Sequence, residues 1–284
     1  MSSFLEYMDG PLQKRALLAC VLFGFANGFM SGFVVLRKSA LKMGTLSHGL
    51  LPGIALAVLL MGLTSTTALA GAMFAAMFIG MGSLFMSRTS RLDQDTSMAI
   101  LYTTAFAAGL IVLQSLGMAQ KLNEWLFGSI TGISDSDLWI AFATSVVAVL
   151  TLTVLQRPLL IYLFEPNVAA SLGVPVRALN YTLFGVMILM LLSSLQAVGC
   201  ILSLGLMVTP GATMYLCSDN TRTIFLGGGI IGAFGATSAF VLSYALGWNI
   251  GSTIVLVLGV LFGFAYVFSP KYGLFAKRRH AVVG

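Results

Sequence analysis

Long apolar runs alternate with short polar links along almost the whole chain. A helix crosses the hydrocarbon core of a bilayer with about 20 apolar residues, and nine runs in this chain approach or exceed that length. We therefore predict nine membrane-spanning helices, with eight or ten as alternatives because three of the runs are short. The predicted spans are residues 14–36, 46–62, 67–87, 97–116, 139–163, 180–196, 198–216, 223–247 and 249–269.

The composition indicates a single all-α membrane domain over residues 1–284. The chain is 58% hydrophobic and 8% charged, a balance that soluble globular domains do not show. Residues 1–13 lack a basic leading segment, so we predict no cleaved signal peptide. The three cysteines are an odd set, which argues against a disulfide framework. The net charge of +6 indicates contact with anionic lipid headgroups rather than with nucleic acid.

Lysine and arginine are divided unequally between the two sides that successive spans define. Of the 15 such residues, twelve fall on one side and three on the other. Cytoplasmic loops carry the positive excess, so the richer side, with the C-terminus, is predicted to be cytoplasmic. Nine spans then place the N-terminus outside. The twelve are Arg37, Lys38, Lys42, Arg88, Arg91, Arg157, Arg177, Arg222, Lys271, Lys277, Arg278 and Arg279, and the three are Lys14, Arg15 and Lys121.

One polar link, FEPNVAASLGVPVRALN at residues 164–180, carries both a start and a stop signal for a helix. Pro166 suits a first helical residue and Gly173 suits a stop, so a helix of about two turns is predicted. Such a helix is too short to cross a bilayer. Leu172, Val174 and Val176 give it an apolar side. From its residues alone, it is either a surface loop between spans or a helix that offers side chains to a partner.

Ionisable residues within predicted spans are few, and such residues are candidates for function because burying them in lipid is costly. His48, in GTLSHGLLPG, lies at the predicted inner start of the second span, next to Ser47 and one turn before Pro52. Imidazole is a ready ligand for a divalent transition metal. The alternative is a histidine bonded to a neighbouring helix. Three weaker metal candidates are Ser47, Asp95, which also suits the start of a helix, and Cys200, which also suits core packing.

Enzyme chemistry has little support in the sequence. No glycine is followed by lysine, so the chain lacks a phosphate-binding loop and cannot hydrolyse ATP by that route. It also lacks HExxH and GxSxG motifs. We predict instead that the glycine-rich run Gly227–Gly235 lets helix backbones pack closely. The loop 121–137 has Trp125 and Trp139 at its edges, as expected near lipid headgroups, and is predicted to lie outside the membrane.

Six segments taken in order resemble the manganese, zinc and iron permeases of bacterial ATP-binding-cassette importers. The resemblance covers roughly residues 11–269. The segments are FVVLRKSALKMGTLSHGLLPGIAL, DTSMAILYTTAFAAGL, EWLFGSITGISDSDL, FEPNVAASLGVPV, QAVGCILSLGLMVTPGAT and LSYALGWNIGSTIVL.

This resemblance implies a homodimeric permease in the bacterial cytoplasmic membrane, similar in fold to the cobalamin and siderophore importers. The short helix after Glu165 would be the coupling helix that docks on a cytoplasmic ATPase dimer, and an extracytoplasmic metal-binding protein would deliver the ion. No cofactor is expected to be permanently bound. The implied coupling residues are Glu165, Pro166, Asn167, Ala169, Ala170, Gly173 and Arg177, and the implied docking residues for the binding protein are Glu124, Trp125, Asp135 and Asp137.

The resemblance also concerns the transported metal. The family usually pairs an aspartate with a histidine four residues later, and this chain has Gly44 and His48 at those positions. Manganese favours oxygen ligands, so loss of that carboxylate weakens a manganese site. A site that binds zinc is then more credible. The substrate is expected to be zinc or manganese, with iron a further candidate. The rival functions are import of a metal chelate, ATP-independent secondary transport or a channel, and a structural membrane anchor.

Overall fold

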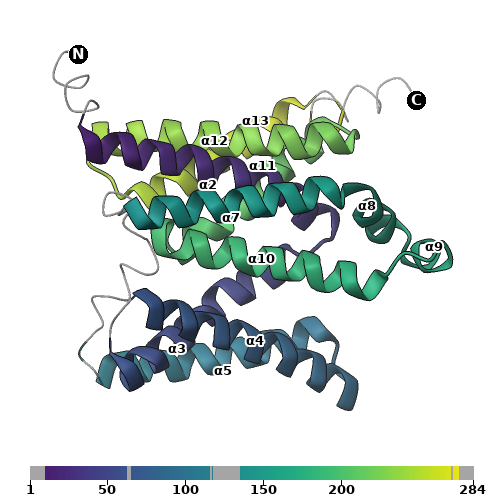
Figure 1. Ribbon diagram of the computed structural model, residues 1–284. Coiled ribbons are helices and arrows are strands. Elements are labelled where there is room, and N and C mark those ends of the chain that lie inside the picture. Colours follow the sequence, from purple (N-terminus) through teal and green to yellow (C-terminus); the bar gives the residue numbers. More distant parts are fainter. Residues whose placement is uncertain (1–9, 63–64, 116, 118–134, 270, 275–284) are drawn as a thin grey trace.

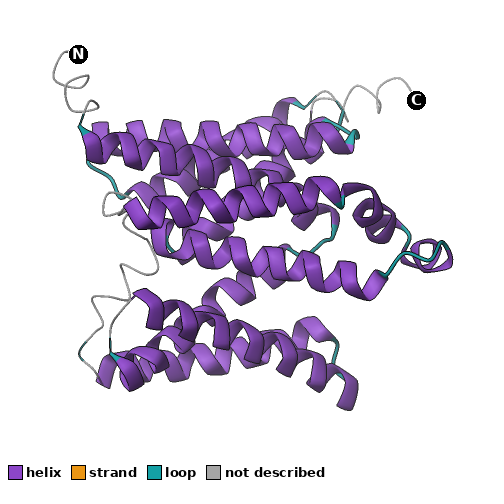
Figure 2. Cartoon of the chain, in the orientation of Figure 1, coloured by secondary structure: helices purple, strands orange, loops and turns teal. Residues whose placement is uncertain are grey.

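The computed structural model describes residues 10–62, 65–115, 117, 135–269 and 271–274. Within these ranges every regular element is a helix (Figure 2). The helices, labelled in Figure 1, are α2 (Pro11–Leu36), α3 (Ala40–Met61), α4 (Ser65–Thr89), α5 (Gln94–Ser115), α7 (Asp135–Val154), α8 (Gln156–Phe164), α9 (Pro166–Ser171), α10 (Val176–Val198), α11 (Cys200–Cys217), α12 (Thr221–Leu246) and α13 (Ile250–Phe268).

The helices agree with the predicted polytopic membrane fold. Seven of the described helices are long and apolar enough to cross a membrane, and the bent pair α7–α8 brings the number to eight. The remaining predicted span, 198–216, corresponds to α11, which has 18 residues. The prediction of eight to ten spans is therefore close, and each predicted span coincides with a helix or with the α7–α8 pair.

The span predicted at 139–163 consists of two helices in the structure, α7 and α8. The chain bends by 67° between α7 and α8. The reason is Pro158, which lacks the N–H that would bond to Val154 and whose ring crowds that turn of helix. Regular helical bonds flank the bend on both sides, from Leu155 N to Thr151 O (3.0 Å) and from Leu159 N to Leu155 O (2.9 Å).

Helices α2 and α12 lie side by side in the upper part of Figure 1 and approach each other closely. A Cβ added to Gly28 would lie 2.3 Å from the carbonyl oxygen of Gly228, and one added to Gly232 would lie 2.1 Å from that of Gly24. Backbones can come this close only where side chains are absent. The predicted packing role of the glycine-rich run is thus confirmed.

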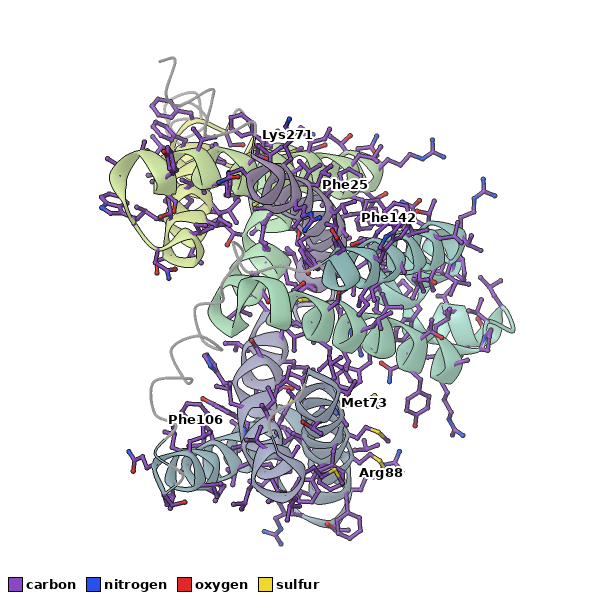
Figure 3. The ribbon with its side chains drawn as sticks, turned by 60° about the vertical axis from the view of Figure 1, so that its left-hand side comes forward. Phe25, Met73, Arg88, Phe106, Phe142 and Lys271 are labelled. Carbon is purple, nitrogen blue, oxygen red and sulfur yellow. The ribbon has the colours of Figure 1, made fainter. Side chains whose placement is uncertain are left out.

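Helices α3, α4 and α5 form a separate group below the others in Figure 1, and they contact the rest mainly through α11 and α10. Figure 3 shows Phe106 of α5 in this group, and Phe25 of α2 and Phe142 of α7 in the other. The group is tightly packed within itself. A Cβ on Gly53 of α3 would lie 2.1 Å from the carbonyl oxygen of Gly71 on α4, and Gly109 of α5 contacts Pro52 of α3.

Hydroxyl and amide groups join the helices inside the larger group. The Asn27 amide on α2 donates to Ser194 Oγ on α10 at 2.8 Å, and the hydroxyls of Thr144 on α7 and Ser193 on α10 are 2.7 Å apart. Hydrogen bonds of this kind hold spans together because lipid offers no competing partner. They connect α2, α7 and α10 within the apolar interior.

Candidate functional site

The links between helices gather at two ends of the bundle. We call one of them the basic end, because it holds the described residues Arg37, Lys38, Lys42, Arg88, Arg91, Arg157, Arg177, Arg222 and Lys271. The short helix α9 projects at this end, beyond α8 (Figure 1). The opposite end carries Lys14 and Arg15 and the link between α10 and α11.

Helix α9 confirms the short helix predicted from Pro166 and Gly173. It has six residues and begins at Pro166, and Gly173 adopts φ +76°, the left-handed conformation that ends a helix. Ala169 is fully buried, and its carbonyl accepts a hydrogen bond from Val174 N at 3.0 Å. One side of α9 is therefore fixed to its own chain.

The other side of α9 faces away from the bundle. Asn167 and Ala170 are exposed, and Val168 and Leu172 keep 46% and 65% of their surface accessible. Glu165 just before the helix and Arg177 in the first turn of α10 are exposed as well. The side chain of Pro166 lies outside the described part. Helix α9 and its flanking residues therefore present both apolar and polar side chains at this end of the bundle.

His48 lies farther inside its helix than predicted. Helix α3 begins at Ala40, six residues before the predicted span, so His48 sits more than two turns from its start. The imidazole is half-buried and stands edge-on to the Phe106 ring of α5, with centroids 6.1 Å apart at 68°. The neighbouring Ser47 is fully buried.

Gly44 lies one turn before His48, where α3 meets α11. A Cβ added there would lie 3.5 Å from Leu204, an ordinary contact distance. A Cβ at residue 44 would therefore fit without a clash. Among the described residues, no three or more His, Cys, Asp or Glu side chains are grouped so that they could hold a metal ion.

Of the weaker metal candidates, Ser47 is adjacent to His48 in α3, whereas Asp95 makes a contact of its own. Asp95 forms an ion pair with Lys42 at 2.9 Å near the basic end. Asp93, just before α5, accepts hydrogen bonds from the backbone of Asp95 and Thr96 and from the Thr96 hydroxyl. The Thr96 bonds in particular lower the pKa of Asp93, as expected for a carboxylate that caps a helix. The side chain of Cys200 lies outside the described part.

The predicted docking residues for a binding protein are only partly described. Glu124 and Trp125 and the side chain of Asp137 lie outside the described residues. Asp135 begins α7 and pairs with Arg15 of α2 at 2.8 Å. This ion pair joins the starts of α2 and α7 at the opposite end of the bundle.

Two contacts at the basic end were not predicted, because each joins residues far apart in the sequence. One links Arg37 to Asn180, and the other ties the segment after α13 to the link between α11 and α12. In the second, Asp219 accepts from Lys271 Nζ at 2.6 Å and from the Tyr272 hydroxyl at 3.0 Å. No local signal in the sequence indicates either pairing.

The Asp219 contact should respond to pH in a defined direction. Hydrogen bonds donated by Lys271 and Tyr272 lower the pKa of Asp219 below its ordinary 3.8, and the bond that Lys271 donates to Asp219 raises the pKa of Lys271 above 10.5. The contact is therefore intact at neutral pH. It is lost as pH falls through the lowered pKa of Asp219, or rises through the raised pKa of Lys271. In a carboxyl NMR titration, Lys271→Gln should move the midpoint of Asp219 up toward 3.8, and an unmoved midpoint would contradict the contact.

A bundle of bilayer-length helices with an exposed short helix at its basic end defines a polytopic membrane protein. Residues 10–269 match the family model described as the ABC 3 transport family. The chain therefore belongs to the ABC 3 transport family.

Relatives and a solved structure match the chain over almost its full length. The manganese transport system membrane protein MntC of Halalkalibacterium halodurans is 31% identical, over 98% of this chain and 95% of its own length. The chelated iron transport system membrane protein YfeD of Yersinia pestis is 28% identical, over 91% and 86%. The structure of PsaBC from Streptococcus pneumoniae in complex with Fab matches with a TM-score of 0.87 and 25% identity, covering 100% of this chain and 99% of that one.

Proposed function

We propose that this chain is the membrane permease subunit of an ATP-driven importer for a divalent transition metal ion. Two copies would form the path through the membrane, a separate ATPase dimer would dock at the basic end on the cytoplasmic side, and a metal-binding protein would deliver the ion from outside. The ion is the substrate, and no resident cofactor is required. The chain would act in transport and leave ATP hydrolysis to its partner.

The observation that carries this proposal is α9. Its Ala169 is buried against the rest of the chain. Asn167, Val168 and Leu172 are exposed on the described part of the chain. Family membership supplies the kind of partner, an ATPase of the ATP-binding-cassette class. Closure of that ATPase would push on α9. The membrane helices would then rearrange and open the path to one side of the membrane.

His48 is the metal-contacting residue in this proposal. It is half-buried in α3 against Phe106 of α5, and neutral imidazole is a ready ligand for zinc and iron. Relatives named for manganese and for chelated iron support a metal cargo. Gly44 contributes no carboxylate, so the remaining ligands would come from a second copy, from backbone carbonyls or from a chelate that arrives with the metal.

The His48→Ala variant should transport metal about tenfold more slowly or worse, because loss of a residue that merely supports a metal ligand already costs about 10- to 100-fold and His48 is the proposed ligand itself. The measurement is uptake of radiolabelled manganese, zinc and iron into vesicles that contain the permease, its ATPase and the delivery protein. The control is Thr103→Ala, whose hydroxyl on α5 bonds to its own helix. Wild-type uptake by His48→Ala at equal protein level would contradict the role of His48.

A metal chelate is the second candidate cargo. The observation that favours it is Gly44, since a chelator supplies the oxygen ligands that this position lacks. The same vesicles distinguish the two: faster uptake of free metal supports the first proposal, and faster uptake of the metal with a hydroxamate or catecholate chelator supports the second.

A further inference from the structure

Three helices meet at a single side-chain oxygen near the basic end. The Arg37 guanidinium, at the end of α2, donates through Nη2 to Asn180 Oδ1 on α10. The Tyr162 hydroxyl on α8 donates to the same Oδ1 at 3.2 Å. All three side chains are half-buried. Arg37 pairs with no carboxylate among the described residues, and its charged guanidinium donates instead to a neutral amide oxygen. A hydrogen bond with a charged donor is stronger than one between two neutral groups.

Tyr162 and Asn180 lie on either side of α9 in the sequence. Tyr162 comes three residues before Glu165, and Asn180 belongs to the first turns of α10, which begins at Val176. Helix α9 packs on both α8 and α10. A displacement of α9 therefore acts directly on the two helices that share the Asn180 oxygen.

Arg37 stands at the other side of this contact, in a stiff connection to α3. Only Arg37, Lys38 and Ser39 separate α2 from α3, and Lys38 adopts φ +56°, the left-handed region that side chains rarely occupy. Backbone bonds from Lys38 N to Val35 O and from Ser39 N to Val34 O, each 2.9 Å, fix the turn. Ser39 then starts α3 by accepting from Met43 N at 3.0 Å. The end of α2 and the start of α3 must move together.

We propose that the Arg37–Asn180–Tyr162 contact carries the movement of α9 to α3, the helix that holds His48. The inference rests on the proposed function and names the residues that perform its coupling step. Coupling between distant sites travels through packed elements and hydrogen bonds that connect them. Here the connection runs from α9 through α8 and α10 to one amide oxygen, and from there through Arg37 and a three-residue turn into α3. These are positioning residues, since the proposed metal contact is made by His48.

The test measures how much metal is imported for each ATP hydrolysed. Arg37→Gln and Asn180→Leu should each leave the ATPase bound and hydrolysing ATP near the wild-type rate. Both should lower metal imported per ATP about tenfold, the effect expected when a hydrogen bond to a charged group is lost. Arg37→Lys, which keeps a charged donor, should restore much of the ratio. A purely structural role would lower both activities together and leave the ratio unchanged.

The control is Arg91→Gln, which removes the same charge from an exposed position at the same end of the bundle and should leave the ratio at its wild-type value. If Arg37→Gln fails to fold, Tyr162→Phe replaces it, because it removes one bond to the shared oxygen and keeps the ring; a smaller fall in the ratio is expected. An unchanged ratio in Asn180→Leu and Tyr162→Phe, with the ATPase bound, would overturn this inference alone. Failure of the wild-type chain to bind an ATPase would overturn the proposed function, and the inference with it.

Discussion

Gly28→Val should prevent the chain from reaching its native packing. A Cβ at residue 28 would lie 2.3 Å from the carbonyl oxygen of Gly228, and real Cβ atoms essentially never come closer than 3.0 Å to a neighbour. The obstacle is backbone, so no side chain can rotate out of the way. Helices α2 and α12 would have to separate along their whole contact. We expect a cost of about 3 kcal/mol or more, at the upper end for overpacked interiors.

The measurement is thermal unfolding of the purified protein in detergent, combined with size-exclusion chromatography. Gly259→Val is the matched control. It makes the same change within α13, where an added Cβ meets no described heavy atom within 4 Å. The control should unfold near the wild-type temperature, while Gly28→Val should aggregate or unfold well below it. Equal unfolding temperatures for the two variants would show that the close approach of α2 and α12 is not required.

Charged residues on the exposed side of α9 should abolish binding of the ATPase without unfolding the permease. The variant is Val168→Asp combined with Leu172→Asp, since these two apolar side chains remain accessible on this short helix. Apolar residues at the centre of an interface each contribute about 2 kcal/mol or more when they are hot spots. Losing two of them should therefore weaken binding by about a thousandfold. Co-purification of the tagged permease with its ATPase measures the effect.

Leu41→Asp is the control for the α9 variant. Leu41 lies near the start of α3, at the same end of the bundle, and is 83% exposed, so it presents an apolar side chain that the docking proposal does not use. This variant should keep the ATPase. Retention of the ATPase by the double α9 variant would remove the basis for the docking role, and its loss from Leu41→Asp would show that the docking surface is broader than α9.

Most of the fold could be predicted because its signals are local. Apolar run length places each helix within a few residues, and Pro166 and Gly173 mark the start and end of α9 by their own backbone preferences. The bend at Leu155 also has a local cause in Pro158, but a proline within an apolar run is compatible with a kinked span as well as a broken one. The early start of α3 is not predicted, because residues 40–45 are polar enough to indicate a connection between helices.

The candidate site was less predictable because its contacts are not local. The sequence identifies His48 as an unusual residue, but only the fold places it against Phe106 of α5. Arg37 and Asn180 are 143 residues apart, and nothing in either segment indicates the other. The ion pair of Asp95 with Lys42 likewise explains an acidic residue that the sequence left open between two roles.

The bend between α7 and α8 sets α8, and α9 beyond it, at an angle to α7. Helix α8 has nine residues, so with a rise of about 1.5 Å per residue its far end lies about 13 Å from the pivot at Leu155. A rotation of about 10° at that pivot would carry α9 sideways by about 2 Å, the size of helix shift by which many proteins switch state. A push on α9 in this direction would thus turn α8 about the bend where it joins α7.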